Sequence, residues 1–117
     1  MTKTIRVLGM RSNSDEGALI LDFPNNLEGM QKFVDGYIEA IRITENIVLW
    51  VNEEGLLKEL PFNFYLTNTD GEPISPIVGD AFFAGINAEG DNVSLTDDDL
   101  KILEERFISR RFFKQYK

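Results

Sequence analysis

Short apolar runs recur along the chain, and polar or turn-forming segments separate them. Their alternating pattern and their β-branched and aromatic content are typical of β-strands. The strands expected on this basis cover residues 4–10, 17–23, 37–43, 47–52 and 80–86. The polar segments at residues 11–16 and 44–46 are short enough to join neighbouring strands as hairpins. The pattern therefore predicts a largely antiparallel sheet.

The middle of the chain is less regular. Residues 52–55 form a predicted turn that leads into residues 56–60, and Pro61 then limits pairing within a sheet. The apolar run Phe62–Leu66 is ambiguous, and we expect a single helical turn packed on the sheet. The chain is then expected to return to the core at Ile74, Ile77 and Val78.

Two helices are predicted from their end signals. Asn25 is expected to cap a short helix after the first hairpin, and Gly36 is expected to end it in a left-handed conformation. Thr96 is a good N-cap for a C-terminal helix. Leu95 and Leu100 have the spacing of a hydrophobic staple across that cap.

These elements together predict the α+β class. The expected architecture is a mostly antiparallel, twisted sheet with a short helix after the first hairpin and a longer C-terminal helix. At 117 residues, the chain fits one domain. We expect a single acidic domain over residues 1–107, with residues 108–117 as a basic, aromatic extension of the last helix.

The order of several short motifs resembles that of a known family. The motifs are the opening strand Thr4–Met10, then Val34–Glu39, Val51–Gly55, Leu60–Asn63, Ile77–Phe83 and Val93–Asp97. Over residues 4–107, the chain resembles the domain-of-unknown-function family 3846, whose members are small proteins of phages, plasmids and integrative elements. Phe64 stands where the usual family motif carries arginine, so no polar role is transferred to it. The resemblance implies a mobile-element setting and no particular chemistry.

Composition narrows the function classes. The chain has no cysteine and no histidine, which removes disulfides, thiolate nucleophiles and the commonest general base. No glycine-rich phosphate loop or nucleophile motif accompanies the 20 carboxylates. We therefore expect a binding protein with no catalytic residues, no bound metal and no cofactor, and rank a carboxylate-based enzyme last. No apolar run is long enough for a membrane helix or signal peptide, which favours the cytoplasm.

Charge is distributed unevenly within the formal net charge of −8. Residues 1–105 contain all 20 acidic residues and seven basic ones, for a net charge of −13, whereas the last twelve residues carry +5. The densest acidic group is Asp97, Asp98 and Asp99 with Glu104 and Glu105. Glu89 and Asp91, which precede the predicted helix, are candidates to extend it, and we call all seven residues the acidic patch. The plainer interpretation is helix capping and a solvated helix face. The functional interpretation is a surface that imitates the phosphates of a nucleic acid.

The basic tail, residues 108–117, also has two interpretations. It interleaves cations with aromatic side chains, and its candidate contact residues are Arg110, Arg111, Phe112, Phe113 and Lys114. Such a segment could touch nucleic acid or a membrane surface. Alternatively, its cations complement the dipole of a helix C-terminus and its aromatic rings fold back onto the domain.

A set of polar residues and two aromatic positions are further candidate sites. Asn68, Asp70, Glu72 and Asp80 offer oxygen ligands, but they give only a fragment of a calcium loop, and an Asx-type turn explains them better. Trp50 is expected to be a core strand residue. The segment Phe62–Tyr65 is either core or, if exposed, a contact surface for a protein partner.

The resemblance and the charge lead to two functional hypotheses. The first is an inhibitor made by a phage or other mobile element against a host nucleic-acid-handling defence factor. Its partner would be a basic nuclease or its nucleoprotein complex, and the specific hypothesis is an anti-CRISPR-type inhibitor of a Cas9-like enzyme. The second is an accessory protein for replication, packaging or transfer that uses the basic tail. In neither hypothesis does the acidic domain itself bind nucleic acid or a membrane.

Overall fold

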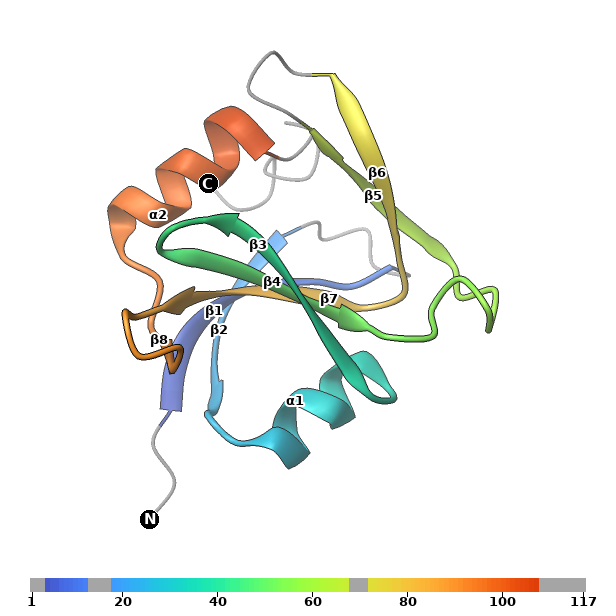
Figure 1. The fold of residues 1–117 in the computed structure, drawn as a ribbon, viewed down its shortest axis with the longest axis horizontal. Helices are drawn as coiled ribbons and strands as arrows, with labels where there is room; N and C mark the ends of the chain where they lie inside the picture. Colours follow the sequence, from blue (N-terminus) through green and yellow to red (C-terminus); the bar gives the residue numbers. More distant parts are fainter. Residues whose placement is uncertain (1–3, 13–17, 68–71, 108–117) are drawn as a thin grey trace.

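The computed structural model describes residues 4–12, 18–67 and 72–107 (Figure 1). It confirms the α+β class with a mostly antiparallel sheet. In chain order, the elements are β1 (Thr4–Met10), β2 (Ala18–Pro24), α1 (Leu27–Val34), β3 (Ile38–Thr44), β4 (Ile47–Asn52), β5 (Phe62–Thr67), β6 (Pro73–Val78), β7 (Ala81–Ile86), β8 (Asn92–Val93), α2 (Asp97–Ile102) and the π-helical turn η1 (Leu103–Phe107).

The main sheet has six strands, in the order β2-β1-β7-β4-β3. The short strand β8 also pairs with β7, on the same edge as β1 but beyond Leu8–Met10, the part of β1 that pairs with β7. All the pairs are antiparallel, and the predicted hairpins β1–β2 and β3–β4 are confirmed. β5 and β6 form a separate two-stranded sheet. Within the part of the chain described, β3 therefore ends the main sheet and has a neighbour on one side only.

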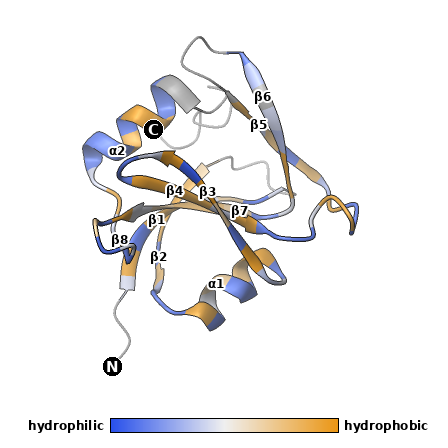
Figure 2. Ribbon diagram, in the orientation of Figure 1, coloured by the Kyte–Doolittle hydropathy of each residue, from blue (hydrophilic) through white to orange (hydrophobic). Residues whose placement is uncertain are grey.

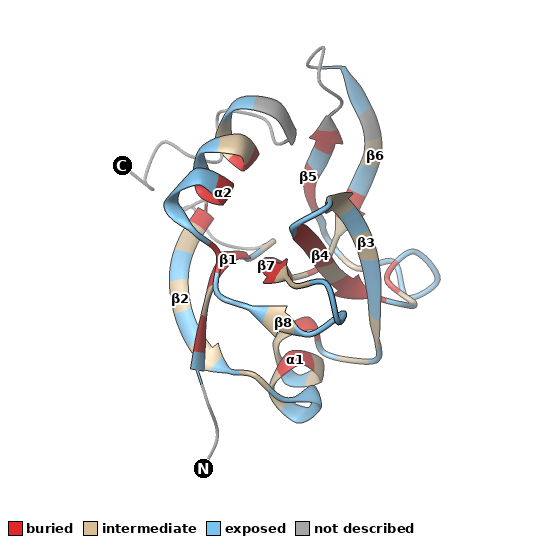
Figure 3. Cartoon of the chain, turned by 60° about the vertical axis from the view of Figure 1, so that its left-hand side comes forward, coloured by how far each residue is buried: buried red, intermediate tan, exposed pale blue. Residues whose placement is uncertain are grey.

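The main sheet is covered on both faces, which explains the nearly continuous apolar sequence of its central strands. Along β4, Leu49 belongs to one core cluster and Val48 to the other, because successive side chains point to opposite faces. The same alternation places Phe83 and Phe82 of β7 in different clusters. Figure 2 shows the hydrophobic positions along β4, and Figure 3 shows that the central strands are buried.

Helix α1 covers one face through Met30 and Val34. Its N-cap is Asn26, whose Oδ1 accepts a hydrogen bond from the Gly29 amide at 2.7 Å, so the expected cap at Asn25 was wrong by one residue. The two asparagines are adjacent, and only the backbone decides which one caps. At the other end, Asp35 adopts the left-handed conformation (φ 61°) that was predicted for Gly36.

The opposite face is covered by the β5–β6 hairpin and by α2 with η1. The expected helical turn at Phe62–Leu66 is wrong, because this segment is strand β5. Phe64 and Leu66 are buried against the main sheet, whereas Phe62 and Tyr65 are exposed. The segment is thus part core and part surface. Its apolar composition suits a helix or a strand, and hydrogen bonding of its backbone to β6 makes it a strand.

Asn63 ties this hairpin to the main sheet. Its side chain is buried, and its Nδ2 donates to the carbonyl oxygens of Met10 at 2.7 Å and Gly79 at 2.8 Å. Gly79 has a positive φ of 74°, and its amide donates to the Pro61 carbonyl at 2.7 Å. Asn63 therefore fixes the start of β5 against the end of β1 and the turn before β7.

The C-terminal helix begins as predicted. Thr96 Oγ1 accepts from the Asp99 amide at 3.0 Å, and Asp99 Oδ2 accepts from the Thr96 amide at 2.9 Å, which is a complete capping box. Leu95 and Leu100, the two residues of the predicted staple, are both buried. From Asp97 the helical segment continues through η1 to Phe107, so it is longer than α1.

Candidate functional site

The structure gives the members of the acidic patch different roles. Asp99 is buried, and its carboxylate is used in the capping box. The Asp97 carboxylate accepts a hydrogen bond from Arg6 Nη2 at 3.0 Å, although its side chain remains 92% exposed. Glu104 is partly buried and makes a contact of its own. The carboxylates of Asp97 and Asp99 are therefore engaged within the chain.

The other four members of the patch are exposed: Glu89, Asp91, Asp98 and Glu105. Glu89 and Asp91 lie in the β7–β8 turn, where Asn87 Oδ1 accepts from their amides at 3.1 and 2.9 Å. Asp98 lies in the first turn of α2 and Glu105 in η1. None of these four carboxylates forms an ion pair with a described residue. They are carried by two segments and do not form one row along a single helix.

Arg6 is a structural residue that the sequence reasoning did not identify. Its Nε and Nη2 donate to the Leu95 carbonyl at 2.9 and 2.7 Å, and the Arg6 carbonyl accepts from the Leu95 amide at 2.9 Å. The Arg6 amide also donates to Ser94 Oγ. Together with Asp97, these contacts hold the start of α2 against β1. The only available signal was a lone charge inside an otherwise uncharged strand.

Of the four candidates for a calcium site, Glu72 and Asp80 lie within the described residues. Asp80 accepts from Arg11 Nη1 at 3.0 Å and from the Ser12 amide at 2.8 Å. Asn68 and Asp70 lie outside the described residues. Over residues 4–12, 18–67 and 72–107, no group of three or more potential metal ligands of the types His, Cys, Asp and Glu occurs. Asp80 thus anchors the segment that leaves β1.

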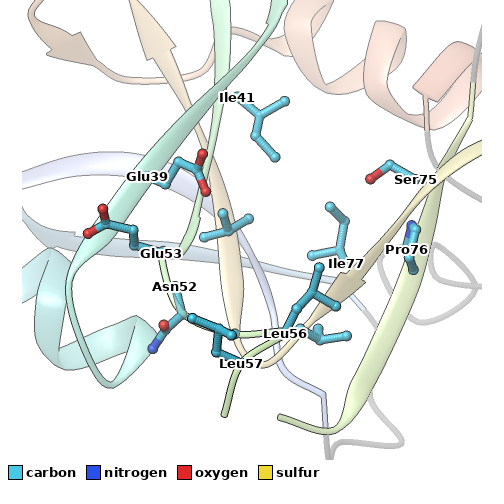
Figure 4. A pocket seen from close by; sticks show the side chains of 12 residues that line it. Glu39, Ile41, Asn52, Glu53, Leu56, Leu57, Ser75, Pro76 and Ile77 are labelled. Atoms are coloured by element: carbon cyan, nitrogen blue, oxygen red, sulfur yellow. The ribbon is translucent and has the colours of Figure 1, made fainter. Parts of the chain in front are cut away.

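A cleft of about 490 Å³ opens between β3 and the β5–β6 hairpin (Figure 4). Three segments that are distant in the sequence form it: β3, the end of β4 with the following turn, and β6. The lining residues are Glu39, Ile41, Val51, Asn52, Glu53, Gly55, Leu56, Leu57, Ser75, Pro76, Ile77 and Val78. Most of these are apolar, and none of them is basic.

The rim of this cleft combines exposed leucines with carboxylates. Leu56 is 73% exposed and Leu57 is 84% exposed. Glu39 and Glu53 are also exposed, and Figure 4 shows both carboxylates on the β3 side, across from Pro76 and Ile77. Exposed apolar residues around a hollow are a common feature of contact surfaces. None of these four rim residues was predicted as a site from the sequence.

A second, wider hollow of about 740 Å³ lies beside Trp50 at the N-terminal end of α1. Trp50 is partly buried against the core on this face, and its Nε1 donates to Asn92 Oδ1 at 3.1 Å. The Asn25 amide group donates to the Asn92 carbonyl at 3.1 Å. Trp50 is therefore a core strand residue, as expected, with its polar end tied to β8.

The basic tail candidates Arg110, Arg111, Phe112, Phe113 and Lys114 lie outside the described residues. Among the helices that are described, none has the length and apolar character needed to cross a membrane.

The fold and these surfaces define a small acidic α+β protein with a two-sided antiparallel sheet, an attached hairpin and an acid-rimmed cleft. The model of a family described as domain of unknown function (DUF3846) matches residues 5–108, and the chain belongs to this family. This match confirms the resemblance seen in the motif order. No curated protein and no solved structure matches the chain.

Proposed function

We propose that this chain is a binding protein of a phage or other mobile element that inhibits a basic nucleic-acid-handling factor in the host cytoplasm. The observation that carries the proposal is the set of four exposed carboxylates, Glu89, Asp91, Asp98 and Glu105, that no described cation neutralises. They belong to a segment, residues 1–105, with a net charge of −13.

The physical basis is electrostatic complementarity. Exposed carboxylates outside ion pairs attract a positively charged groove and raise the association rate. The capping box and the Arg6 contacts support this role, because they fix the start of α2 and hence the direction in which Asp98 points. A surface that is already ordered loses less entropy on binding than a flexible one.

A Cas9-like nuclease is the specific partner that we propose. Such enzymes hold the guide–target duplex in a positively charged channel and read a short DNA motif with arginines. An acidic domain seated in either place would exclude DNA. The assay uses the guide-loaded complex, because the proposed partner is the nuclease or its nucleoprotein complex.

The test measures target cleavage by guide-loaded Cas9 at increasing protein excess over a salt series. We expect inhibition that weakens as salt rises, because screening reduces the attraction between exposed charges. Unchanged cleavage at every salt concentration and every protein excess would reject this partner. Capture from a host lysate, followed by mass spectrometry, would then show whether any other basic factor binds.

A matched pair of variants tests the carboxylates themselves. The first variant neutralises the four exposed members of the patch: Glu89→Gln, Asp91→Asn, Asp98→Asn and Glu105→Gln. The control makes the same charge change at exposed positions on other segments: Asp22→Asn, Asp35→Asn, Glu45→Gln and Glu59→Gln. We expect the first variant to lose at least tenfold in inhibition and the control to lose less than threefold, since exposed ion pairs contribute about 0.2–1 kcal/mol each. Equal losses would show that net charge, and not the patch, is responsible.

A further inference from the structure

We infer that the cleft between β3 and β6 binds an extended segment of a partner protein, which adds as a strand to β3 and places an apolar side chain in the cleft between flanking lysine or arginine residues. This surface is separate from the acidic patch, and the inference does not depend on the identity of the host factor.

The first observation is an open strand edge. Within the part of the chain that the structure describes, β3 pairs with β4 and with no other strand. The backbone N–H and C=O groups on its other side are therefore available to an added strand. Across the cleft, β6 carries Pro73 and Pro76, and proline has no N–H to donate. Strand addition is thus favoured at β3 and hindered at β6.

The second observation is the apolar lining next to that edge. Ile41 projects from β3 on the same face as Glu39, and Val51 and Ile77 lie deeper in the cleft. Alternate residues of a strand point to the same side, so an added strand would also present every second side chain to this lining. A volume of about 490 Å³ lies within the range of about 300–1,000 Å³ typical of binding pockets.

The third observation is the sign of the charge at the rim. Glu39 and Glu53 line the cleft, and no lysine or arginine among the described residues does. The nearby Lys58 is directed to Glu54, with a distance of 3.7 Å from Nζ to Oε1. A segment with positive residues on either side of its apolar anchor is therefore complementary, whereas an acidic segment is repelled.

The exposed leucines indicate that the cleft contacts a protein and not a small molecule. Leu57 is 84% exposed and Leu56 is 73% exposed, at the mouth of the cleft. Neither packs in the two core clusters, so neither is explained by folding. A partner that covers them would remove their apolar surface from water, which is the usual source of affinity at the centre of an interface.

The test uses a fluorescein-labelled peptide with a central leucine among valines and threonines and with two arginines at each end. Binding is measured by fluorescence polarisation, and the backbone amides of β3 are followed by NMR in the full chain. We expect saturable binding with shifts centred on Glu39–Ile41. A peptide in which glutamates replace the arginines should bind at least tenfold more weakly. Absence of β3 amide shifts at millimolar peptide would overturn the proposal.

Variants at exposed positions separate binding from folding. Leu57→Ala should weaken binding about fivefold, and Glu39→Gln with Glu53→Gln should weaken it about three- to tenfold. Leu27→Ala is the matched control, because Leu27 is 59% exposed on α1, away from the cleft. Equal affinity in the Leu57 variant and the wild type would contradict the proposal. Peptide binding that emerges only after deletion of residues 108–117 would also contradict it and would assign the cleft to the chain's own basic tail.

Discussion

Replacement of Asn63 by alanine tests how the β5–β6 hairpin is attached to the main sheet. The Asn63 side chain is only 6% exposed, and its amide donates two short hydrogen bonds, to the Met10 and Gly79 carbonyls. These contacts join β5 to the end of β1 and to the turn before β7. Alanine removes both donors and supplies nothing in their place, so the hairpin loses a buried polar connection.

The expected loss follows from these two bonds. A neutral intramolecular hydrogen bond contributes about 0.5–1.5 kcal/mol, and a buried acceptor left without its donor costs about 1–3 kcal/mol. With about 1.5 kcal/mol for each of the two lost bonds, we expect Asn63→Ala to lower the free energy of unfolding by about 3 kcal/mol. At about 4 °C per kcal/mol for a chain of this size, Tm falls by about 12 °C.

Urea unfolding followed by circular dichroism measures this loss, and amide hydrogen exchange locates it. Exchange should accelerate most in β5 and β6, because they pair only with each other within the described sheets. The control Asn46→Ala, at an exposed turn position, should change stability by less than about 0.5 kcal/mol. A loss below about 1 kcal/mol for Asn63→Ala, or faster exchange in β1 alone, would refute the reasoning.

Three further substitutions probe other parts of the fold. Asn63→Asp places a buried carboxylate against two carbonyl oxygens, which raises the pKa of that carboxyl in the folded state. Its loss of stability relative to wild type should be largest above this pKa and shrink as the pH falls through it, as urea titrations at several pH values would show. Thr96→Ala removes the cap of the Asp99 amide and should cost about 1 kcal/mol in urea unfolding, whereas Thr96→Ser should cost little. Phe64→Ala empties a fully buried site and should cost about 4 kcal/mol by calorimetry, and a loss below about 2 kcal/mol would contradict its place in the core.

The strands of the main sheet could be predicted because their chemistry is local. β1, β3 and β4 have strong β-formers, and turn-forming segments follow each of them. The cap at Thr96 was equally local, since a capping box needs only residues three apart. By contrast, the choice between Asn25 and Asn26 depended on how the chain leaves β2. That direction is set by the packing of α1 on the sheet, and the residues that take part in this packing are distant in the sequence.

The contacts between distant segments could not be predicted in this way. Asn63 meets Met10 across 53 residues, and Arg6 meets Leu95 across 89. The cleft likewise joins β3, the turn after β4, and β6. Glu39 and Leu57 were ordinary surface residues in sequence, and only the tertiary structure places them around one hollow. Charge composition pointed to binding in general, but it could not locate a surface.

The misassigned β5 and the open cleft have the same physical cause. Pro61 before β5, together with Pro73 and Pro76 in β6, weakened the strand signal of this region, because proline interrupts a ladder of backbone hydrogen bonds. The same prolines hinder this hairpin from continuing the main sheet, so it forms a separate two-stranded sheet held by Asn63 and by the burial of Phe64. Since the hairpin stands beside β3 without pairing to it, the edge of β3 and the apolar wall of β6 face a common space. The prolines that weakened the prediction of β5 from the sequence are therefore the same residues that keep the hairpin apart from β3 and leave space for the strand of the proposed partner.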